Sequence, residues 1–148
     1  VCTVAGSLLR PLGGGLADRF GGTRVLAVVL GVAASLSLAL ATLPALGVTV
    51  AALFVLLGLL GMGNGAVFQL VGKRVPTRVG AMTGLVGAAG GVGGFLLPFG
   101  FGAMSSAPAS FATGFVVLAA IMGAASVAGL ARDRVWATTP VPNLAGAA

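Results

Sequence analysis

Several residue types on which enzymes and metal sites depend are scarce or missing in this chain of 148 residues. It has no histidine and no tyrosine, one cysteine (Cys2), one tryptophan (Trp136) and two carboxylates (Asp18 and Asp133). A single cysteine excludes an internal disulfide, and so few ligands leave no plausible metal site and no reason to expect a cofactor. A Ser/His/Asp or Cys/His catalytic arrangement is impossible without histidine. We therefore expect that the chain is not an enzyme.

Apolar residues dominate what is present. Hydrophobic residues make up 58% of the chain and charged residues 7%, whereas a soluble domain carries about 25% charged residues. This composition is typical of an integral membrane protein. The net charge of +6 does not indicate a nucleic-acid partner, because the charges lie in short clusters between apolar segments and not along one solvated face.

Five apolar segments predict an all-α membrane protein, a polytopic helical bundle in contact with the lipid bilayer. Four are long enough to cross about 30 Å of hydrocarbon as helices, and the first is marginal. The chain begins inside an apolar run, without Met or a signal peptide, so we interpret it as part of a longer protein. The predicted helices are residues 1–17, 25–43, 48–71, 80–103 and 111–131, which form one transmembrane bundle over 1–131, and residues 132–148 are a tail.

The connections between these segments alternate in charge. The first, the third and the tail carry basic residues, and the second and fourth carry none. Seven of the eight basic residues therefore fall on one side of the membrane, which is the cytoplasmic side by the positive-inside rule. We expect a multi-pass protein of the cell membrane with a cytoplasmic C-terminus, whose five helices suit the last five of an even-numbered bundle.

Arg10 is the exception to this pattern. It lies eight residues before Asp18, about 12 Å along a helix and so near the middle of the bilayer. A charge there costs about 3 kcal/mol on insertion scales, and such residues mark functional sites unless they snorkel to the interface. Pro11 predicts a bend, and Gly6, Gly13 and Gly14 are expected to keep the face of Arg10 free of bulk. No membrane segment here holds an acid, so its partner is a carboxylate elsewhere or a mobile anion.

The stretch GGLADRFGGTR joins the first two helices. Asp18 can accept from backbone N–H groups of the next helix or pair with a basic residue, and two arginines anchor the turn at the headgroups. The string resembles the G-x-L-A-D-R-x-G loop motif of the major facilitator superfamily, with Gly22 and Thr23 where two basic residues are common. The residues assigned to this loop motif are Gly14, Asp18, Arg19, Gly21 and Arg24.

A glycine stripe marks the fourth segment. Its glycines repeat at intervals of four and three and line one face of a helix. Close packing against another helix explains such a stripe. In the functional alternative, the exposed backbone slides past a neighbouring helix or faces a small polar substrate. The glycines of this stripe are Gly80, Gly84, Gly87, Gly91 and Gly94, and Gly90 and Gly93 widen it.

Three stretches together resemble the nitrate/nitrite porter family of the major facilitator superfamily over roughly residues 6–102. GLVGAAGGVGGF is similar to the family's Gly-rich signature in helix eleven, GNGAVFQLV to its helix ten, and GSLLRPLGGGLADRFGGTR to its helix eight and the following loop. The resemblance implies a C-terminal half that transports nitrate or nitrite by alternating access. Arg10 matches the family's helix-eight substrate arginine, and the second arginine belongs to an N-terminal half, which is a partner outside this chain.

The resemblance also suggests further site residues, for which alternatives stay open. Phe68 stacks on the flat anion or simply packs, and Asn64 and Gln69 form interhelical hydrogen bonds or contact the ligand. Gly90 and Gly91 are assigned to the substrate path, and Gly84, Gly87 and Gly94 to helix packing. A different porter of the superfamily, for drugs or organic anions, and a membrane scaffold without transport remain the alternatives; an intramembrane carboxylate in the other half would favour either.

Overall fold

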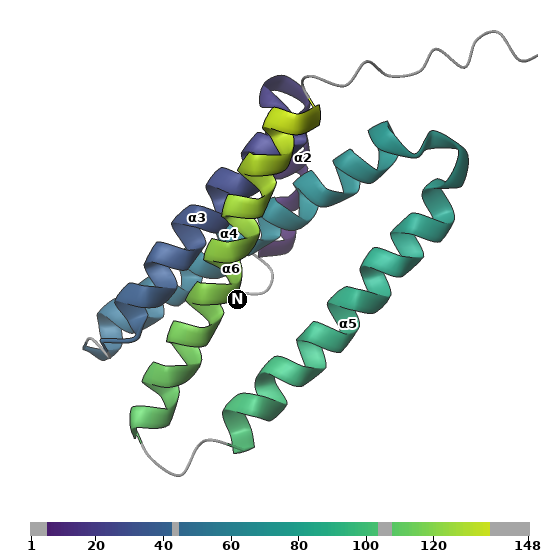
Figure 1. Cartoon of the computed structure of the whole chain (residues 1–148). Coiled ribbons are helices and arrows are strands. Elements are labelled where there is room, and N and C mark those ends of the chain that lie inside the picture. Colours follow the sequence, from purple (N-terminus) through teal and green to yellow (C-terminus); the bar gives the residue numbers. More distant parts are fainter. Residues whose placement is uncertain (1–5, 43–44, 104–107, 137–148) are drawn as a thin grey trace, which may run out of the picture.

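The computed structural model describes residues 6–42, 45–103 and 108–136 (Figure 1). Every regular element among these residues is helical, which confirms the predicted all-α class, and the helix count is roughly as expected. The elements are α2 (Arg10–Phe20), α3 (Gly22–Leu40), α4 (Leu46–Arg74), the short 3₁₀ helix η1 (Pro76–Arg78), α5 (Val79–Ala103) and α6 (Pro108–Trp136).

Four helical stretches in the described part of the chain are long and apolar enough to cross a membrane. They are Gly22–Leu40, Leu46–Arg74, Pro76–Leu96 and Phe111–Arg132. These stretches indicate a multi-pass membrane protein. Helix α2 has 11 residues and is not among them, and α6 runs to Trp136, so that residues 132–136 of the predicted tail are helical.

The turn between α2 and α3 depends on one glycine. Gly21 has a φ of 91°, a left-handed conformation that side chains with a Cβ rarely adopt. Its N–H donates to the carbonyl of Ala17 at 3.1 Å and ends α2. The chain then reverses, and α3 begins at once with Gly22, which is buried beside Leu70 of α4.

The core of the bundle lies among α3, α4 and α6. Its buried centre consists of Ala33 and Leu40 of α3, Leu56 of α4 and Met122 of α6. Leucines make up most of this cluster, and the small Ala33, with Ala34 and Ala52 beside it, lets the helices approach closely. One buried polar contact joins two of these helices, because the Ser126 hydroxyl of α6 donates to the carbonyl of Ala27 in α3 at 2.6 Å.

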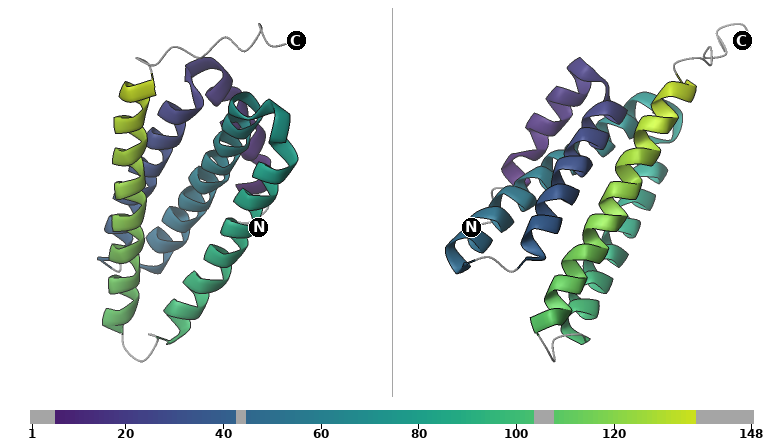
Figure 2. Two further views of the ribbon diagram at one scale, coloured as in Figure 1. Left: turned by 45° about the vertical axis from the view of Figure 1, so that its right-hand side comes forward. Right: turned by 60° about the vertical axis from the view of Figure 1, so that its left-hand side comes forward.

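Helix α5 stands at the edge of the bundle (Figure 1 and the left view of Figure 2). It contacts α4 and α6 only slightly, and none of the residues in its most apolar window is buried. Its large apolar side chains, such as Leu85, Val92 and Phe95, point outward. Packing within this chain therefore contributes little to holding α5 in place.

One end of the bundle collects the basic residues. The α2–α3 turn, the η1 segment and the C-terminal end of α6 all lie at the upper end in Figure 1. These segments carry Arg19 and Arg24, Arg78, and Arg132, and Lys73 and Arg74 end α4 at the same place. The alternation seen in the sequence thus corresponds to a real clustering in space.

Candidate functional site

Arg10 is the first residue of α2. Residues 6–8 are helical, Leu9 forms a turn, and α2 then runs without interruption to Phe20. Pro11 lies in the first turn of α2 and has no N–H to continue the hydrogen-bond ladder of the preceding segment. Near the predicted bend, the structure has one turn residue, Leu9, whose φ of −83° and ψ of −9° stay in the helical region. Eight residues of continuous helix separate Arg10 from Asp18, a rise of about 12 Å.

The backbone of Arg10 is held by a close contact with α4. A Cβ on Gly65 would overlap the carbonyl oxygen of Arg10 and lie 3.1 Å from the amide nitrogen of Gly14. A Cβ on Gly61 would likewise overlap the carbonyl of Gly6, and one on Gly13 would overlap the carbonyl of Met62. We call these five close-packed positions, Gly6, Arg10, Gly13, Gly61 and Gly65, the α2–α4 seam.

The seam corrects one expectation. Gly6 and Gly13 were expected to leave space beside the Arg10 guanidinium, but both are buried against α4. They lie on the face of the chain that α4 covers, so their missing side chains allow two backbones to meet. The sequence signal for this contact is the spacing of Gly58, Gly61 and Gly65, which places three glycines on one face of α4.

The Arg10 side chain is exposed at this position. No ion pair or hydrogen bond to its guanidinium is found within residues 6–42, 45–103 and 108–132, whose side chains include one carboxylate, Asp18. Asp18 instead binds Lys73. The arrangement presents a cation on a backbone that packs closely against α4.

Two of the candidate substrate residues lie on α4, the helix that contacts the backbone of Arg10, and two do not. Asn64 is partly buried and directly precedes Gly65, which touches Arg10. Phe68, with 37% of its surface exposed, follows one turn later on the same face as Asn64. Gly90 and Gly91 lie on α5, which does not contact α2 among the described residues. The structure therefore brings α4 to Arg10 but not α5.

The glycine stripe of α5 faces open space. A Cβ added at Gly84, Gly87 or Gly94 would meet nothing within 4 Å, and the same holds for Gly90 and Gly91. Close packing of the stripe is thus not found against any described part of this chain. The prediction that Gly84, Gly87 and Gly94 pack against another helix therefore stays a prediction, and that helix would lie outside the described residues.

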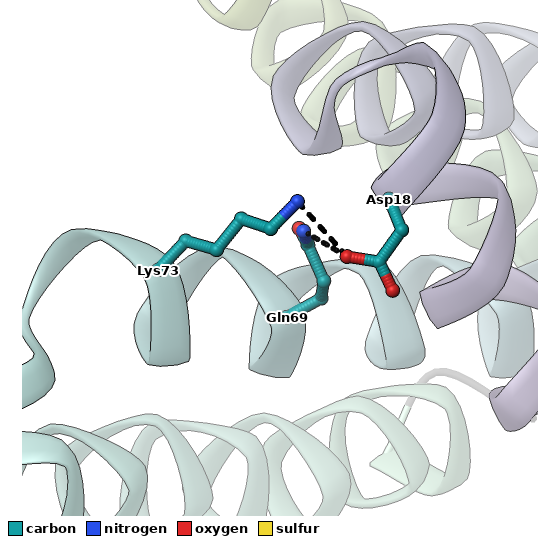
Figure 3. Close-up of polar contacts among 3 residues, drawn as sticks. All are labelled: Asp18, Gln69 and Lys73. Carbon is teal, nitrogen blue, oxygen red and sulfur yellow. Dashed lines mark hydrogen bonds and ion pairs between the residues drawn. The ribbon is translucent and has the colours of Figure 1, made fainter.

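The loop motif is tied to the end of α4 by its aspartate (Figure 3). Asp18 Oδ1 lies 2.9 Å from Lys73 Nζ and accepts a hydrogen bond of 2.8 Å from Gln69 Nε2. The Lys73 ammonium, and then the Gln69 amide, lower the pKa of Asp18. Because this pKa is lowered, the ion pair stabilises the folded state at pH values above the ordinary pKa of an aspartate. This stability is lost as the pH falls through the lowered pKa of Asp18. Both side chains are 58% exposed, so the pair is a modest tether.

A second polar contact lies beside this tether. Arg74 Nη2 donates to Thr23 Oγ1 at 3.0 Å and so joins the end of α4 to the start of α3. Arg19 and Arg24 are exposed at the same end, and Gly14 is partly buried beside Gly65. Of the two alternatives for Asp18, pairing with a basic residue is the one observed. The sequence did not identify which basic residue pairs with Asp18. For Gln69, the structure shows the interhelical hydrogen bond, which was one of its two alternatives.

Comparison with known proteins gives relatives of consistent description. The chain is 43% identical over 102 residues to a probable nitrate/nitrite transporter NarK2 of Mycobacterium tuberculosis. The aligned segment covers 68% of this chain and 26% of that protein. It is 33% identical over 115 residues to a nitrite extrusion protein of Bacillus subtilis, covering 78% and 29%. It is also 33% identical over 123 residues to a probable nitrate transporter NarT of Staphylococcus haemolyticus, covering 76% and 29%.

The chain thus spans between 26% and 29% of the length of these curated relatives. No family model matches it, and no solved structure matches it. The described helices are long and apolar enough for a multi-pass membrane protein, as transporters of this kind require. Over the residues that it covers, the chain belongs to the nitrate/nitrite porter family of the major facilitator superfamily.

Proposed function

We propose that this chain is the C-terminal part of a membrane transporter for nitrate, nitrite or both. The observation that carries the proposal is Arg10, an exposed guanidinium about 12 Å along α2 from the basic end of the bundle. A charge at this depth is retained in membrane proteins where it serves a ligand or an ion pathway. The relatives named as nitrate and nitrite transporters supply the substrate class.

The chemistry of the anion fits this side chain. Nitrate and nitrite are small, planar and singly charged, and a guanidinium is planar and donates two parallel hydrogen bonds. At low dielectric, anion and cation each reduce the cost of burying the other. Arg10 forms one side of the site, and an arginine from an N-terminal half forms the other. The two halves alternate access by rocking about the bound anion.

The remaining site residues take supporting roles in this proposal. Asn64 and Phe68 lie on the helix that touches the backbone of Arg10 through Gly65, and the proposal assigns them to the substrate path. The exposed glycines of α5, Gly90 and Gly91 included, line the path from a second side when the N-terminal half is present. Their bare backbone is available for such a contact, since nothing in the described chain covers it.

Anion uptake tests the proposal directly. The complete protein, meaning this chain with the proposed N-terminal half, is reconstituted into vesicles, and uptake of nitrate, nitrite, chloride and sulfate is compared with that of protein-free vesicles. We expect nitrate or nitrite to enter far faster than chloride or sulfate. Chloride has no pair of oxygens to accept from the guanidinium fork, and sulfate is doubly charged and therefore costs more to bring into a site of low dielectric. Equal rates for all four anions, or uptake no faster than in the empty vesicles, would contradict the proposal.

The proposed orientation places the basic end of the bundle in the cytoplasm, in the cell membrane. Thr77 of η1 is exposed at this end, and Thr42 is exposed at the opposite end, after α3. In a background without other cysteines, we expect Thr77→Cys to react with an impermeant thiol reagent only from the cytoplasmic side and Thr42→Cys only from outside. The reversed pattern would show that the orientation is wrong, and labelling of both from the same side would show that α4 does not cross the membrane between them.

A further inference from the structure

A pocket of about 510 Å³ opens at the basic end of the bundle, where four helices meet. The start of α3, the end of α4, the start of α5 and the end of α6 all contribute to its wall. It is separate from the Arg10 region, because none of its lining residues belongs to α2. The lining residues are Thr23, Leu70, Val71, Arg74, Val75, Met82, Ala125, Ala128, Gly129 and Arg132.

The lining combines two kinds of chemistry. Seven of these residues are apolar or small; six come from α4, α5 and α6, and the seventh, Val75, directly follows α4. The polar members are two arginines and one threonine, and no carboxylate is found among the described residues that line the pocket. The pocket therefore attracts a ligand with an anionic group and an apolar remainder. A free inorganic anion would use the arginines and leave the apolar wall without a function.

The cationic part of the pocket is organised. The Arg74 guanidinium donates to the Thr23 hydroxyl at 3.0 Å, which orients it toward the start of α3. Arg132 adds a second guanidinium from the last turns of α6. Guanidinium groups suit phosphate because their N–H donors form a planar fork. Two of them in one pocket are well suited to a phosphodiester.

The place of the pocket identifies the source of that phosphate. Its arginines lie at the end of the bundle that carries the basic loops, where the transmembrane helices end and the lipid headgroups begin. Basic pockets between transmembrane helices at this depth bind anionic lipid headgroups. We infer that the pocket binds one anionic phospholipid, with its phosphate between Arg74 and Arg132 and an acyl chain along the apolar wall. This inference does not depend on nitrate being the substrate.

Lipid titration with the complete protein tests the inference. Delipidated protein is titrated with phosphatidylglycerol or with phosphatidylcholine of the same acyl chains, and bound lipid is counted by native mass spectrometry. We expect Arg74→Gln and Arg132→Gln each to weaken phosphatidylglycerol binding by about fivefold, and the double variant by about thirtyfold. Phosphatidylcholine binding should be weaker from the start and change little.

Two further variants separate the pocket from its surroundings. Arg78→Gln removes a charge from η1 at the same end without touching the pocket, so its binding should stay within about twofold of the unsubstituted protein. Ala128→Phe keeps both arginines and fills the apolar wall, so it should weaken phosphatidylglycerol binding without changing the charge. Thermal unfolding in lipid-free detergent checks that each variant is folded.

Each outcome decides the inference. Loss of binding in the arginine variants and in Ala128→Phe, with Arg78→Gln unaffected, supports a phospholipid site. Equal losses in Arg78→Gln would show general surface attraction, and unchanged binding in the double variant would show that another part of the protein covers the pocket. Displacement of the lipid by millimolar inorganic phosphate, with Ala128→Phe silent, would identify a free-anion site. Any of these three results overturns the inference.

Discussion

Replacing Arg10 with lysine is expected to remove most nitrate uptake although the positive charge is kept. Lysine neutralises the anion as a point donor, but it does not reproduce the two parallel hydrogen bonds of a guanidinium. The loss of one charge-assisted hydrogen bond costs about 1.5–3 kcal/mol, which is about ten- to a hundredfold in affinity. The backbone cannot shift to compensate, because Gly65 of α4 abuts the carbonyl of Arg10.

The measurement is nitrate uptake into vesicles, normalised to the amount of inserted protein. Arg78→Lys is the matched control, since Arg78 is an exposed arginine of η1 outside both the proposed anion site and the loop motif, and it should transport normally. Arg10→Ala should be more severe than Arg10→Lys, because the anion would then have no compensating charge at low dielectric.

Two rival roles for Arg10 give different results in the same assay. If the side chain only snorkels to the interface, lysine serves equally well and Arg10→Lys is silent. If Arg10 pairs with an acid in another part of the protein as a structural element, its loss reduces inserted protein and leaves the normalised rate unchanged. Wild-type uptake by Arg10→Lys would remove Arg10 from the substrate site.

Replacing Gly65 with alanine is expected to destabilise the bundle and to reduce transport together. The added Cβ would overlap the Arg10 carbonyl oxygen, and the obstacle is backbone, which cannot rotate away as a side chain can. Overpacking of this kind costs about 1–3 kcal/mol. Since α2 must move to relieve the overlap, Arg10 moves with it, and the anion site is displaced as well.

A second glycine of α4 provides the comparison. A Cβ at Gly72 would meet nothing within 4 Å, so Gly72→Ala tests the same chemical change without the overlap. It should be neutral or slightly stabilising, because alanine favours helix more than glycine does. The midpoint of thermal unfolding and the normalised uptake rate are measured for both variants. If Gly65→Ala had the same unfolding midpoint and the same uptake rate as Gly72→Ala, α2 and α4 would not approach each other as closely as the structure shows.

The transmembrane organisation could be predicted because its signals are local. Apolar length identifies a spanning helix without knowledge of its neighbours, and the alternation of basic loops fixes which helix ends meet. The turn at Leu9 also has a local signal, since Pro11 cannot donate a backbone hydrogen bond wherever it lies. These features need only the residues within one helix or one loop.

Contacts between helices were harder to predict. The glycine stripe of α5 has the same regular spacing as the glycines of α4, yet it is Gly6, Gly13, Gly61 and Gly65 that pack closely in this chain. Spacing shows that residues share a face, but it does not show what covers that face. In the same way, the motif indicated that Asp18 has a partner, but its partner Lys73 lies 55 positions later, and only the fold brings them together.

The weak attachment of α5 has an energetic consequence. The buried cluster is built from α3, α4 and α6, so a displacement of α5 would separate few of this chain's packed side chains. The link to α4 is η1, preceded by Val75 with φ of −134° and ψ of 60°, a non-helical residue that separates the two helical rods. The free-energy difference between one position of α5 and another is therefore determined mainly by what lies beyond this chain: lipid, the rest of the protein and the anion itself.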